Sequence, residues 1–256
     1  MAEAKRVVIV TGGSSGIGAA SSRELAHRGW CVVVNYSKSA GDADKVVEQC
    51  IKAGGDAIAL RADVSQDADC RKLAAAAVEK WGRLDALVNN AGTTKFVPHA
   101  KLGELSEEDF LRIYRLNVVG PFQMTRACAE PLKAARGAVV NVSSLAALLG
   151  TGSSIAYAAS KGALNSLTFS LARVLAPEVR VNAVCPGFVD TPWMVQGYGA
   201  ERYAQLSKSY AAAAPLGSTC KPEDIAETIA WLIEGARQVT GETIFVDAGM
   251  HVATPR

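Results

Sequence analysis

The residues of this chain that are best suited to acid–base chemistry are a serine, a tyrosine and a lysine close together in the sequence. Ser144 is followed thirteen residues later by Tyr157 and, four residues further on, by Lys161. A tyrosine and a lysine at i and i+4 share one face of a helix, so their polar ends can converge. Because a nearby ammonium favours the phenolate, we expect Lys161 to lower the pKa of Tyr157 from about 10 toward the range of an efficient general acid.

A glycine-rich turn near the start of the chain has the features of a phosphate-binding loop. The apolar run Val7–Val10 predicts a buried strand, and residues 19–27, which end before Gly29, have a helical pattern. The turn Thr11–Gly18 lies between them, and its glycines would let the backbone approach a phosphate at the start of a helix. The spacing Gly-x-x-x-Gly-x-Gly differs from the general fingerprint Gly-x-Gly-x-x-Gly, so a tight turn without a ligand is the alternative.

The composition of the chain argues against several other classes of protein. Its 256 residues carry a formal net charge of +2, with 49% hydrophobic and 20% charged residues, which is typical of one globular domain. So small a charge gives no electrostatic basis for binding nucleic acid or an anionic membrane. The apolar run Val7–Val10 is too short for a signal peptide or a membrane span, so we expect a cytoplasmic protein.

The cysteines and histidines give no sign of a metal centre. None of the six cysteines forms a Cys-x-x-Cys pair, and none lies at a metal-ligand spacing from one of the three histidines. We therefore expect all six thiols to be reduced and structural, and we expect no metal.

Apolar strand patterns alternate with helical patterns along the whole chain. Strands are predicted at Val7–Val10, Cys31–Asn35, Ala57–Arg61, Ala86–Asn89, Ala138–Val142, Val179–Val184 and Thr243–Val246. Helices are predicted at Gly16–His27, Asp42–Ala53, Gln66–Trp81, Glu107–Leu132, Tyr157–Leu175 and Glu223–Glu234. This alternation predicts an α/β fold, a single-domain, Rossmann-type doubly wound parallel sheet of seven strands with helices on both faces.

The polar motifs of the chain follow the predicted strands, where such sheets bind their ligands. The glycine turn follows the first strand and Asp63–Val64 follows the third. Asn89–Gly92 ends the fourth strand, Ser144 ends the fifth and Pro186–Gly187 ends the sixth. Five loops are thus predicted to converge on one edge of the sheet, which indicates a binding or catalytic site.

These motifs, in this order and at this spacing, resemble those of the short-chain dehydrogenases/reductases. The resemblance runs from Val7 to Val252. It rests on Thr11–Gly18, Asp63–Val64, Asn89–Gly92, Asn117–Gly120, Ser144, Tyr157–Lys161, Pro186–Gly187 and Thr191. Within the family, the chain is similar to the 3-oxoacyl-carrier-protein reductases and to the glucose dehydrogenase-like members. The resemblance implies an oxidoreductase that moves hydride between a nicotinamide cofactor and a carbonyl or secondary alcohol, and it implies the strand order 3-2-1-4-5-6-7.

The resemblance also implies a role for each of four catalytic residues. Ser144 would hydrogen-bond the carbonyl oxygen of the substrate, and Tyr157 would donate its proton to the same oxygen. Lys161 would in addition bind the nicotinamide ribose. Asn117 would lie in a helix beside Lys161 and hold a water for a proton relay. Ser143 is a rival donor, but the spacing to Tyr157 favours Ser144.

The residues expected to bind the cofactor lie mostly in the same loops, with Thr191 placed to hold the nicotinamide carboxamide. They are Gly12, Ser14, Ser15, Gly16, Ile17 and Gly18; Asn35, Tyr36, Ser37 and Lys38; Asp63 and Val64; Asn90, Ala91 and Gly92; Tyr157 and Lys161; and Pro186, Gly187, Val189 and Thr191.

The residues after the second strand indicate the type of cofactor. NAD-binding sites of this kind have an acid there that accepts a hydrogen bond from the ribose 2′-OH. This chain has Tyr36 at that place, followed by Ser37 and Lys38, so a 2′-phosphate would meet no carboxylate. We therefore expect NADP(H), with NAD(H) as the second choice, because Ser15 stands where many NADP-preferring relatives have arginine. Lys38 would contact the 2′-phosphate; alternatively, it is a loop lysine that is solvated and binds no ligand.

The segment from about residue 191 to residue 215 is expected to form a lid over the substrate. It is rich in aromatic residues and is interrupted by Gly197 and Gly199, which is typical of a mobile lid beside a partly apolar pocket. Alternatively, its aromatic side chains simply cover the helix behind them. The substrate is expected to be a small carbonyl or alcohol compound, and a compound similar to a 3-oxoacyl thioester is one candidate.

The sequence leaves two other functions and a second assembly as alternatives. A non-catalytic NADP-sensing or scaffold protein would usually lack one of the catalytic residues, and an isomerase, epimerase or dehydratase would usually carry a longer segment after the last strand. The apolar surfaces of the helix 157–175 and of the strand near residue 243 favour, by resemblance, a homotetramer with two-fold symmetry. A monomer that buries these residues under the lid is the alternative.

Overall fold

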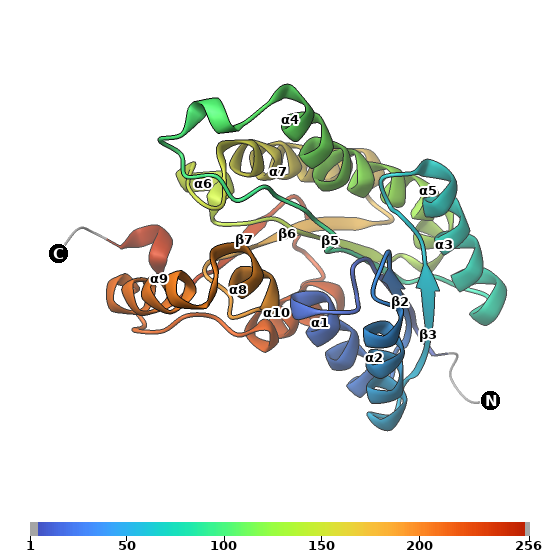
Figure 1. Ribbon diagram of the computed structural model, residues 1–256. Helices are drawn as coiled ribbons and strands as arrows, with labels where there is room; N and C mark the ends of the chain where they lie inside the picture. The colour runs from blue at the N-terminus through green and yellow to red at the C-terminus, as the bar shows by residue number, and fades with distance from the viewer. Residues whose placement is uncertain (1–4, 254–256) are drawn as a thin grey trace.

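The chain folds around one parallel β-sheet. A computed structural model describes residues 5–253, and within that range the seven strands lie in the order β3-β2-β1-β4-β5-β6-β7 (Figure 1). They are β1 (Val7–Val10), β2 (Cys31–Tyr36), β3 (Asp56–Arg61), β4 (Ala86–Asn89), β5 (Ala138–Val142), β6 (Arg180–Pro186) and β7 (Thr243–Val246). All neighbouring strands are parallel. The predicted fold class and strand order are therefore confirmed.

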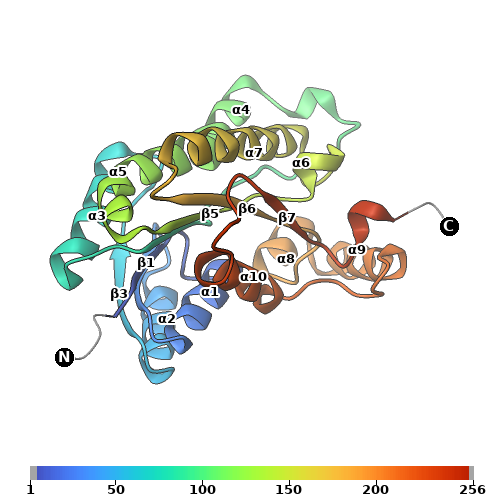
Figure 2. The same ribbon diagram turned by 180° about the vertical axis from the view of Figure 1, so that it is seen from behind.

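Helices cover both faces of the sheet (Figure 1, Figure 2). One face carries α1 (Gly16–His27), α2 (Ala40–Lys52) and α10 (Pro222–Glu234), and the other carries α3 (Asp67–Trp81), α5 (Gly120–Ala135) and α7 (Ile155–Leu175). The whole of β1 is buried: Val8 and Val10 belong to one core cluster, whereas Val7 and Ile9 belong to the other. A strand that is buried on both faces reads as a continuous apolar run, which explains why β1 was recognisable in the sequence.

The observed ends of most elements lie within two residues of the predicted ends, but one predicted helix is interrupted. Where the sequence predicts a single helix over Glu107–Leu132, the structure has α4 (Glu107–Tyr114), a π-helical turn (Arg115–Val119) and α5. Asn117 lies in the π-helical turn, and its buried side chain bonds to residues outside this helix. Because those partners come from distant parts of the chain, the spacing of apolar residues along the helix could not predict the interruption.

Five elements of the described chain were not predicted. They are the helices α6 (Ala146–Leu149), α8 (Pro192–Tyr198) and α9 (Ala200–Ala213) and the 3₁₀ turns Leu102–Glu104 and Met250–Val252. Helices α8 and α9 form most of the expected lid segment and are separated by Gly199, whose φ of 76° suits glycine. Across residues 5–253, no helix has both the length and the apolar character that crossing a membrane requires.

Candidate active site

The catalytic candidates meet at the carboxyl end of β5. Ser144 follows β5 and hydrogen-bonds to Tyr157, which lies in the first turn of α7. The side chain of Ser154 caps α7 and accepts a hydrogen bond from the Tyr157 backbone N–H at 3.2 Å. One turn further along α7, the buried Lys161 donates from Nζ to the carbonyl oxygen of Val142 at 2.7 Å. The three side chains that the sequence analysis grouped by spacing are thus brought together.

The alternative donor, Ser143, has a different environment. Ser143 is buried, and its hydroxyl donates to the backbone carbonyl of Lys161 at 3.3 Å. Ser144 is partly exposed, and its Oγ accepts from the backbone N–H of Ala146 at 3.1 Å. Since the Ser144 hydroxyl is left free to donate toward Tyr157 and the site, this geometry favours Ser144 over Ser143 as a substrate ligand.

Burial dominates the ionisation of Tyr157 and Lys161. It raises the pKa of Tyr157 to about 12, against a smaller lowering by the hydrogen bond with Ser144. Burial also lowers the pKa of Lys161 to about 8. The expectation that the pKa of Tyr157 is lowered was wrong for this arrangement. Burial outweighs any effect of the ammonium, which is bonded to Val142 and lies over the tyrosine ring, 5.6 Å from its centroid.

Asn117 joins the loop after β4 to α7. Its Oδ1 accepts from the Thr93 backbone N–H at 2.8 Å, and its Nδ2 donates to the Thr93 carbonyl at 2.9 Å and to Ser160 Oγ at 3.0 Å. A Cβ atom on Gly92 would lie 3.4 Å from Asn117 Oδ1 and 3.8 Å from Lys161 Nζ, so these groups are close neighbours. The side chain of Asn117 is engaged with the protein, and its expected role in a proton relay stays a prediction.

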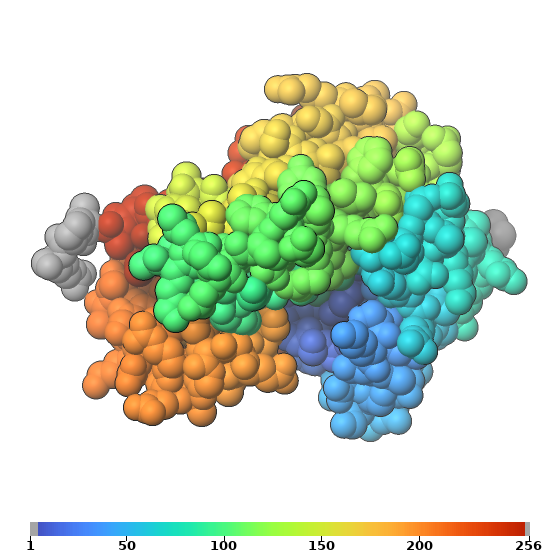
Figure 3. Space-filling view, turned by 45° about the horizontal axis from the view of Figure 1, so that its top comes forward, coloured from blue at the N-terminus to red at the C-terminus, as the bar shows by residue number. Residues whose placement is uncertain are grey.

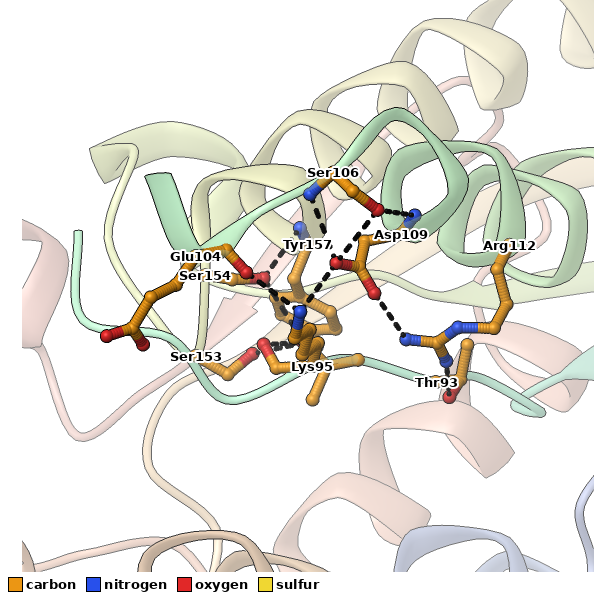
Figure 4. A network of polar contacts seen from close by, with 10 residues as sticks. Thr93, Lys95, Glu104, Ser106, Asp109, Arg112, Ser153, Ser154 and Tyr157 are labelled. Atoms are coloured by element: carbon orange, nitrogen blue, oxygen red, sulfur yellow. Dashed lines mark hydrogen bonds and ion pairs between the residues drawn. The ribbon is translucent and has the colours of Figure 1, made fainter. Parts of the chain in front are cut away.

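A polar network next to the catalytic residues was missed by the sequence analysis (Figure 4). Lys95 Nζ donates to Asp109 Oδ2 at 2.7 Å and to the Glu104 carbonyl at 2.8 Å. The hydrogen bond from Lys95 lowers the pKa of Asp109 to about 2. Thr94 Oγ1 lies 2.8 Å from Ser153 Oγ. Ser153 directly precedes Ser154, the residue that caps α7. The network therefore fastens the loop after β4 to α4 and to the start of the helix that carries Tyr157.

The glycine turn between β1 and α1 is built on close backbone contacts. Gly12 and Gly16 have positive φ values of 60° and 51°, which glycine adopts without strain. A Cβ atom on Gly18 would collide with the carbonyl oxygen of Gly12 and with the side chain of Asn90. The Asn90 Nδ2 donates to the carbonyl oxygens of Thr11 and Gly12 at 2.9 and 3.1 Å, which holds the turn against the end of β4. Ser14, Ser15 and Ile17 keep partial or full exposure at its surface.

Asn35 supports the glycine turn from inside the protein. Its Oδ1 accepts from Gly12 N–H at 3.2 Å, and its Nδ2 donates to the Ala62 carbonyl at 3.0 Å. The side chain is buried, so it positions the turn instead of facing a ligand. Tyr36 is partly buried at the end of β2, whereas Ser37 and Lys38 are exposed.

The remaining predicted loops reach the same edge of the sheet. Asp63 is exposed after β3, while Val64 is buried and its carbonyl packs against Gly120. Ala91 and Gly92 follow β4, and Ala91 N–H donates to Thr11 Oγ1 at 3.0 Å.

The loop after β6 closes the site on its other side. Gly187 N–H donates to the Val246 carbonyl at 3.0 Å, and the Pro186 carbonyl accepts from Leu145 N–H at 2.8 Å. Val189 is buried and forms a bridge with Cys220. Thr191 lies beside the glycine turn, since a Cβ atom on Gly16 would be 3.4 Å from Thr191 Cγ2. In the space-filling view, the start of the chain (dark blue) is visible at the bottom of a hollow between the lid segment (orange) and α2 (Figure 3).

Three aromatic side chains, Phe96, Trp193 and Tyr198, form a cluster beside Tyr157, here called the aromatic wall. The centroid of Phe96 lies 5.6 Å from that of Trp193 and 4.7 Å from that of Tyr198, both in edge-to-face arrangement. The centroid of Trp193 lies 6.0 Å from that of Tyr157. Phe96 belongs to the loop after β4 and was not singled out from the sequence, whereas Trp193 and Tyr198 belong to α8.

Comparisons with known proteins identify the family. Residues 12–251 match the family model described as Enoyl-(Acyl carrier protein) reductase. Over 247 residues, 96% of each chain, the protein is 43% identical to one described as ketoacyl reductase 2 of the granaticin polyketide synthase from Streptomyces violaceoruber. It is 36% identical to glucose 1-dehydrogenase 2 of Bacillus subtilis over 252 residues, 96% of this chain and 94% of that protein.

A solved structure agrees with this result. The crystal structure of a short-chain dehydrogenase/reductase from Burkholderia xenovorans matches with a TM-score of 0.91 and 40% identity, covering 98% of this chain and 100% of that chain. The chain belongs to the short-chain dehydrogenase/reductase family. The resemblance stated from the sequence motifs is therefore confirmed.

As a short-chain dehydrogenase/reductase, the protein is an oxidoreductase that acts on carbonyl or alcohol groups with a nicotinamide cofactor. The glycine turn fits such a cofactor, because it places the N-terminus of the twelve-residue α1 behind backbone that has no Cβ atoms at positions 16 and 18. No group of three or more metal-ligating side chains occurs in the part of the chain that the structure describes.

Proposed function

We propose that this protein is an NADP(H)-dependent oxidoreductase that interconverts a ketone and a secondary alcohol in the cytoplasm. The observation that carries the proposal is the hydrogen-bonded pair Ser144 and Tyr157, with the buried Lys161 beneath it, at the edge of the sheet where the glycine turn lies. When bound, the cofactor supplies or accepts the hydride. Everything else in the reaction is done by side chains of this chain.

In the reduction direction, two side chains act on the substrate oxygen. The Ser144 hydroxyl donates a hydrogen bond to the carbonyl oxygen and stabilises the negative charge that develops on it. The Tyr157 hydroxyl donates its proton to the same oxygen as the carbon is reduced. A pKa of about 12 keeps Tyr157 protonated at neutral pH, which is the form that a general acid needs.

Lys161 has two functions in this proposal. Its ammonium, which lies over the tyrosine ring, would offset part of the cost of the tyrosinate that forms when the proton leaves, although burial outweighs it in the free protein. It is also expected to hydrogen-bond the nicotinamide ribose. Asn117 keeps the loop after β4 in place beside Lys161 through its bonds to Thr93 and Ser160.

The cofactor is proposed to lie along the carboxyl edge of the sheet. The glycine turn would hold the pyrophosphate, and Asp63, Val64, Ala91 and Gly92 would border the adenosine and the nicotinamide ribose. Thr191 would hold the carboxamide. Supporting the choice of NADP(H), the exposed residues after β2 are Ser37 and Lys38, with no carboxylate between Tyr36 and Asp42.

The substrate is proposed to be a ketone with an apolar body, and 3-oxoacyl thioesters are the first class to test. The aromatic wall supports this, because Phe96, Trp193 and Tyr198 offer apolar surface next to Tyr157. Residues 191–215 are proposed to act as the substrate lid. The relative from Streptomyces violaceoruber is described as a ketoacyl reductase, which is compatible with this class of substrate.

Oxidation of NADPH in the presence of single ketones tests the proposal. The panel consists of 3-oxoacyl thioesters, cyclic ketones, quinones and aldoses, with NADH measured in parallel. We expect turnover of at least one carbonyl compound with NADPH, and loss of that turnover in Tyr157→Phe. Binding of NADPH without turnover of any carbonyl compound would instead favour a non-catalytic NADP-binding protein.

We also propose that the protein is a homotetramer. In support, large apolar side chains on α4, α5 and α7 are exposed: Phe110, Leu111, Tyr114, Phe122, Phe169 and Val174. Phe169 and Val174 are not buried under the lid, contrary to what the monomer alternative requires. The six free cysteines, all buried, are compatible with the reducing environment of the cytoplasm. Light scattering decides the assembly, because a mass near 26.8 kDa would exclude it.

A further inference from the structure

An arginine that the sequence motifs did not mark lies beside the residues expected to select the cofactor. Arg61 is the last residue of β3, and in the parallel register it pairs with Tyr36, the last residue of β2. Paired residues of neighbouring strands project to the same face of a sheet. Tyr36 packs on the core cluster of the face that α1 and α2 cover, so Arg61 projects to that face, at the carboxyl edge.

The guanidinium group of Arg61 is held at one atom and is available at the others. Its Nε donates to the backbone carbonyl of Ser37 at 3.2 Å, which ties the side chain to the turn after β2. Among residues 5–253, neither of its Nη atoms takes part in a hydrogen bond or an ion pair, and the residue is exposed. A planar group that is anchored through Nε still presents donors suited to two oxygens of a phosphate.

The charges around this group favour an anion. Lys38, in the same turn, is exposed and forms no ion pair within the described part of the chain. Of the acids nearest in the sequence, Asp42 pairs with Lys45, and Asp63 keeps its charge while its carboxylate accepts a hydrogen bond from Ser65 N–H at 3.0 Å. No carboxylate in the described residues is paired with Arg61. The glycine turn contributes serines and no cation, so the positive charge at this edge comes from the ends of β2 and β3.

We propose that Arg61 is the residue that selects NADP(H), by binding the 2′-phosphate of the adenosine ribose through its Nη atoms. The inference rests on the proposed function, since it needs a nicotinamide cofactor in the groove. Lys38 adds charge on a flexible stem, whereas the Nε bond to Ser37 orients Arg61 before the ligand arrives. Arg61 thereby takes the part that an arginine in the glycine turn would otherwise play.

Binding of adenosine nucleotides tests this assignment without any turnover. Isothermal titration calorimetry compares 2′,5′-ADP with 5′-ADP on the wild type, on Arg61→Gln and on Arg61→Lys. We expect the wild type to bind 2′,5′-ADP more tightly than 5′-ADP. Arg61→Gln should weaken the binding of 2′,5′-ADP by about 10- to 100-fold and leave the affinity for 5′-ADP unchanged. Arg61→Lys should recover only part of the loss. The control is Lys52→Gln, which removes one exposed positive charge at the far end of α2.

The possible outcomes separate this inference from the proposed function. If Arg61→Gln binds 2′,5′-ADP as the wild type does, or loses both nucleotides equally, the inference is overturned; in the second case Arg61 only shapes the turn at Ser37. If the wild type has no preference for 2′,5′-ADP, the choice of NADP(H) fails together with the inference. If the nucleotide preferences behave as expected but no carbonyl compound is reduced, the inference stands and the proposed enzymatic function fails.

Discussion

Two glycines of this protein, Gly18 in the cofactor turn and Gly197 in α8, both stand where a Cβ atom would collide with a neighbour. At Gly18 the neighbours are the backbone carbonyl of Gly12 and the amide of Asn90. At Gly197 the neighbour is the outer edge of the Phe96 ring. The Gly12 backbone is hydrogen-bonded to Asn35 of β2 and to Asn90 after β4, so it has little room to shift, whereas the Phe96 ring is the far end of a side chain. We therefore expect the side of the site formed by the glycine turn to be rigid, and the side formed by residues 191–215, the proposed lid, to be adjustable.

The largest effect is expected when a side chain is added at Gly18, the position enclosed by backbone. Gly18→Ala should destabilise the fold by at least about 3 kcal/mol, because the new methyl group must displace backbone of the turn. Gly41→Ala is the matched control, since Gly41 lies in the first turn of α2 with nothing within 4 Å of its Cβ position, and alanine favours a helix there. Urea unfolding compares the two variants. Equal stability of both would show that the turn can relax, and the contrast with the lid would disappear.

The ionisation of Lys161 provides a second measure of rigidity on the cofactor side. A buried lysine whose pKa is lowered from 10.5 to about 8 binds fewer protons in the folded state than in the unfolded state between these values. Stability must therefore rise with pH between about 8 and 10.5, and the destabilisation is fully present below pH 8. The shift corresponds to up to about 3 kcal/mol.

The measurement for Lys161 is a comparison of the free energies of unfolding of the wild type and Lys161→Met at several pH values. Groups other than Lys161 titrate in both proteins and largely cancel in the difference. We expect the wild type to gain stability relative to the variant as the pH is raised from 8 to 10.5. A difference that is independent of pH would mean that the lysine is solvated in solution, in conflict with its 4% exposure here.

Tyr157 contacts both sides of the site. Its hydroxyl hydrogen-bonds with Ser144, and its ring centroid lies 6.0 Å from that of Trp193 in the proposed lid. Tyr157→Phe keeps the ring and its contact with Trp193 but removes the proton, so the rate of ketone reduction should fall by about 10²-fold or more. The dissociation constant of NADPH should remain within a factor of about two. Steady-state rates and NADPH fluorescence provide the two readouts. A variant with most of the wild-type rate would remove Tyr157 from the mechanism.

The same contrast explains what the sequence could predict. The glycine turn, β1 and the pair Tyr157 and Lys161 are specified by local rules, namely a buried β-branched run, glycines before a helix and a four-residue spacing. The π-helical turn at Asn117 is not, because its side chain bonds to Thr93 and Ser160 from other elements. Three-dimensional contacts likewise determine the pKa of Tyr157, for which the spacing alone predicted the wrong direction.

The lid and Arg61 were harder to interpret for a related reason. The aromatic residues and glycines of residues 191–215 led to the prediction of a lid, which stays a prediction, but they did not reveal α8 and α9, whose helical pattern is interrupted by Gly199. Tyr203, which donates to Asp190 at 2.8 Å, and Tyr210, which donates to the Asp247 carbonyl at 2.8 Å, fasten α9 to the loops after β6 and β7. A role for Arg61 could not be predicted from the sequence, because it depends on the pairing of Arg61 with Tyr36 in the sheet.

The smallest effect is expected from filling the adjustable position in the lid. Gly197→Ala should raise the KM for the ketone by about 10-fold or less, because the Phe96 ring must turn and the contact between α8 and the loop after β4 loosens. Binding of NADPH should be unaffected, since the glycine turn lies on the other side of the groove.

The double variant Gly197→Ala with Phe96→Ala decides whether this contact is responsible. Truncation of Phe96 removes the ring that the new methyl group meets, so the effect of Gly197→Ala should be smaller in the Phe96→Ala background than in the wild type. Additive effects of the two changes would mean that Gly197 acts through the backbone of α8 and not through Phe96. In that case the lid would be as rigid as the cofactor turn, and the distinction between the two regions would have to be abandoned.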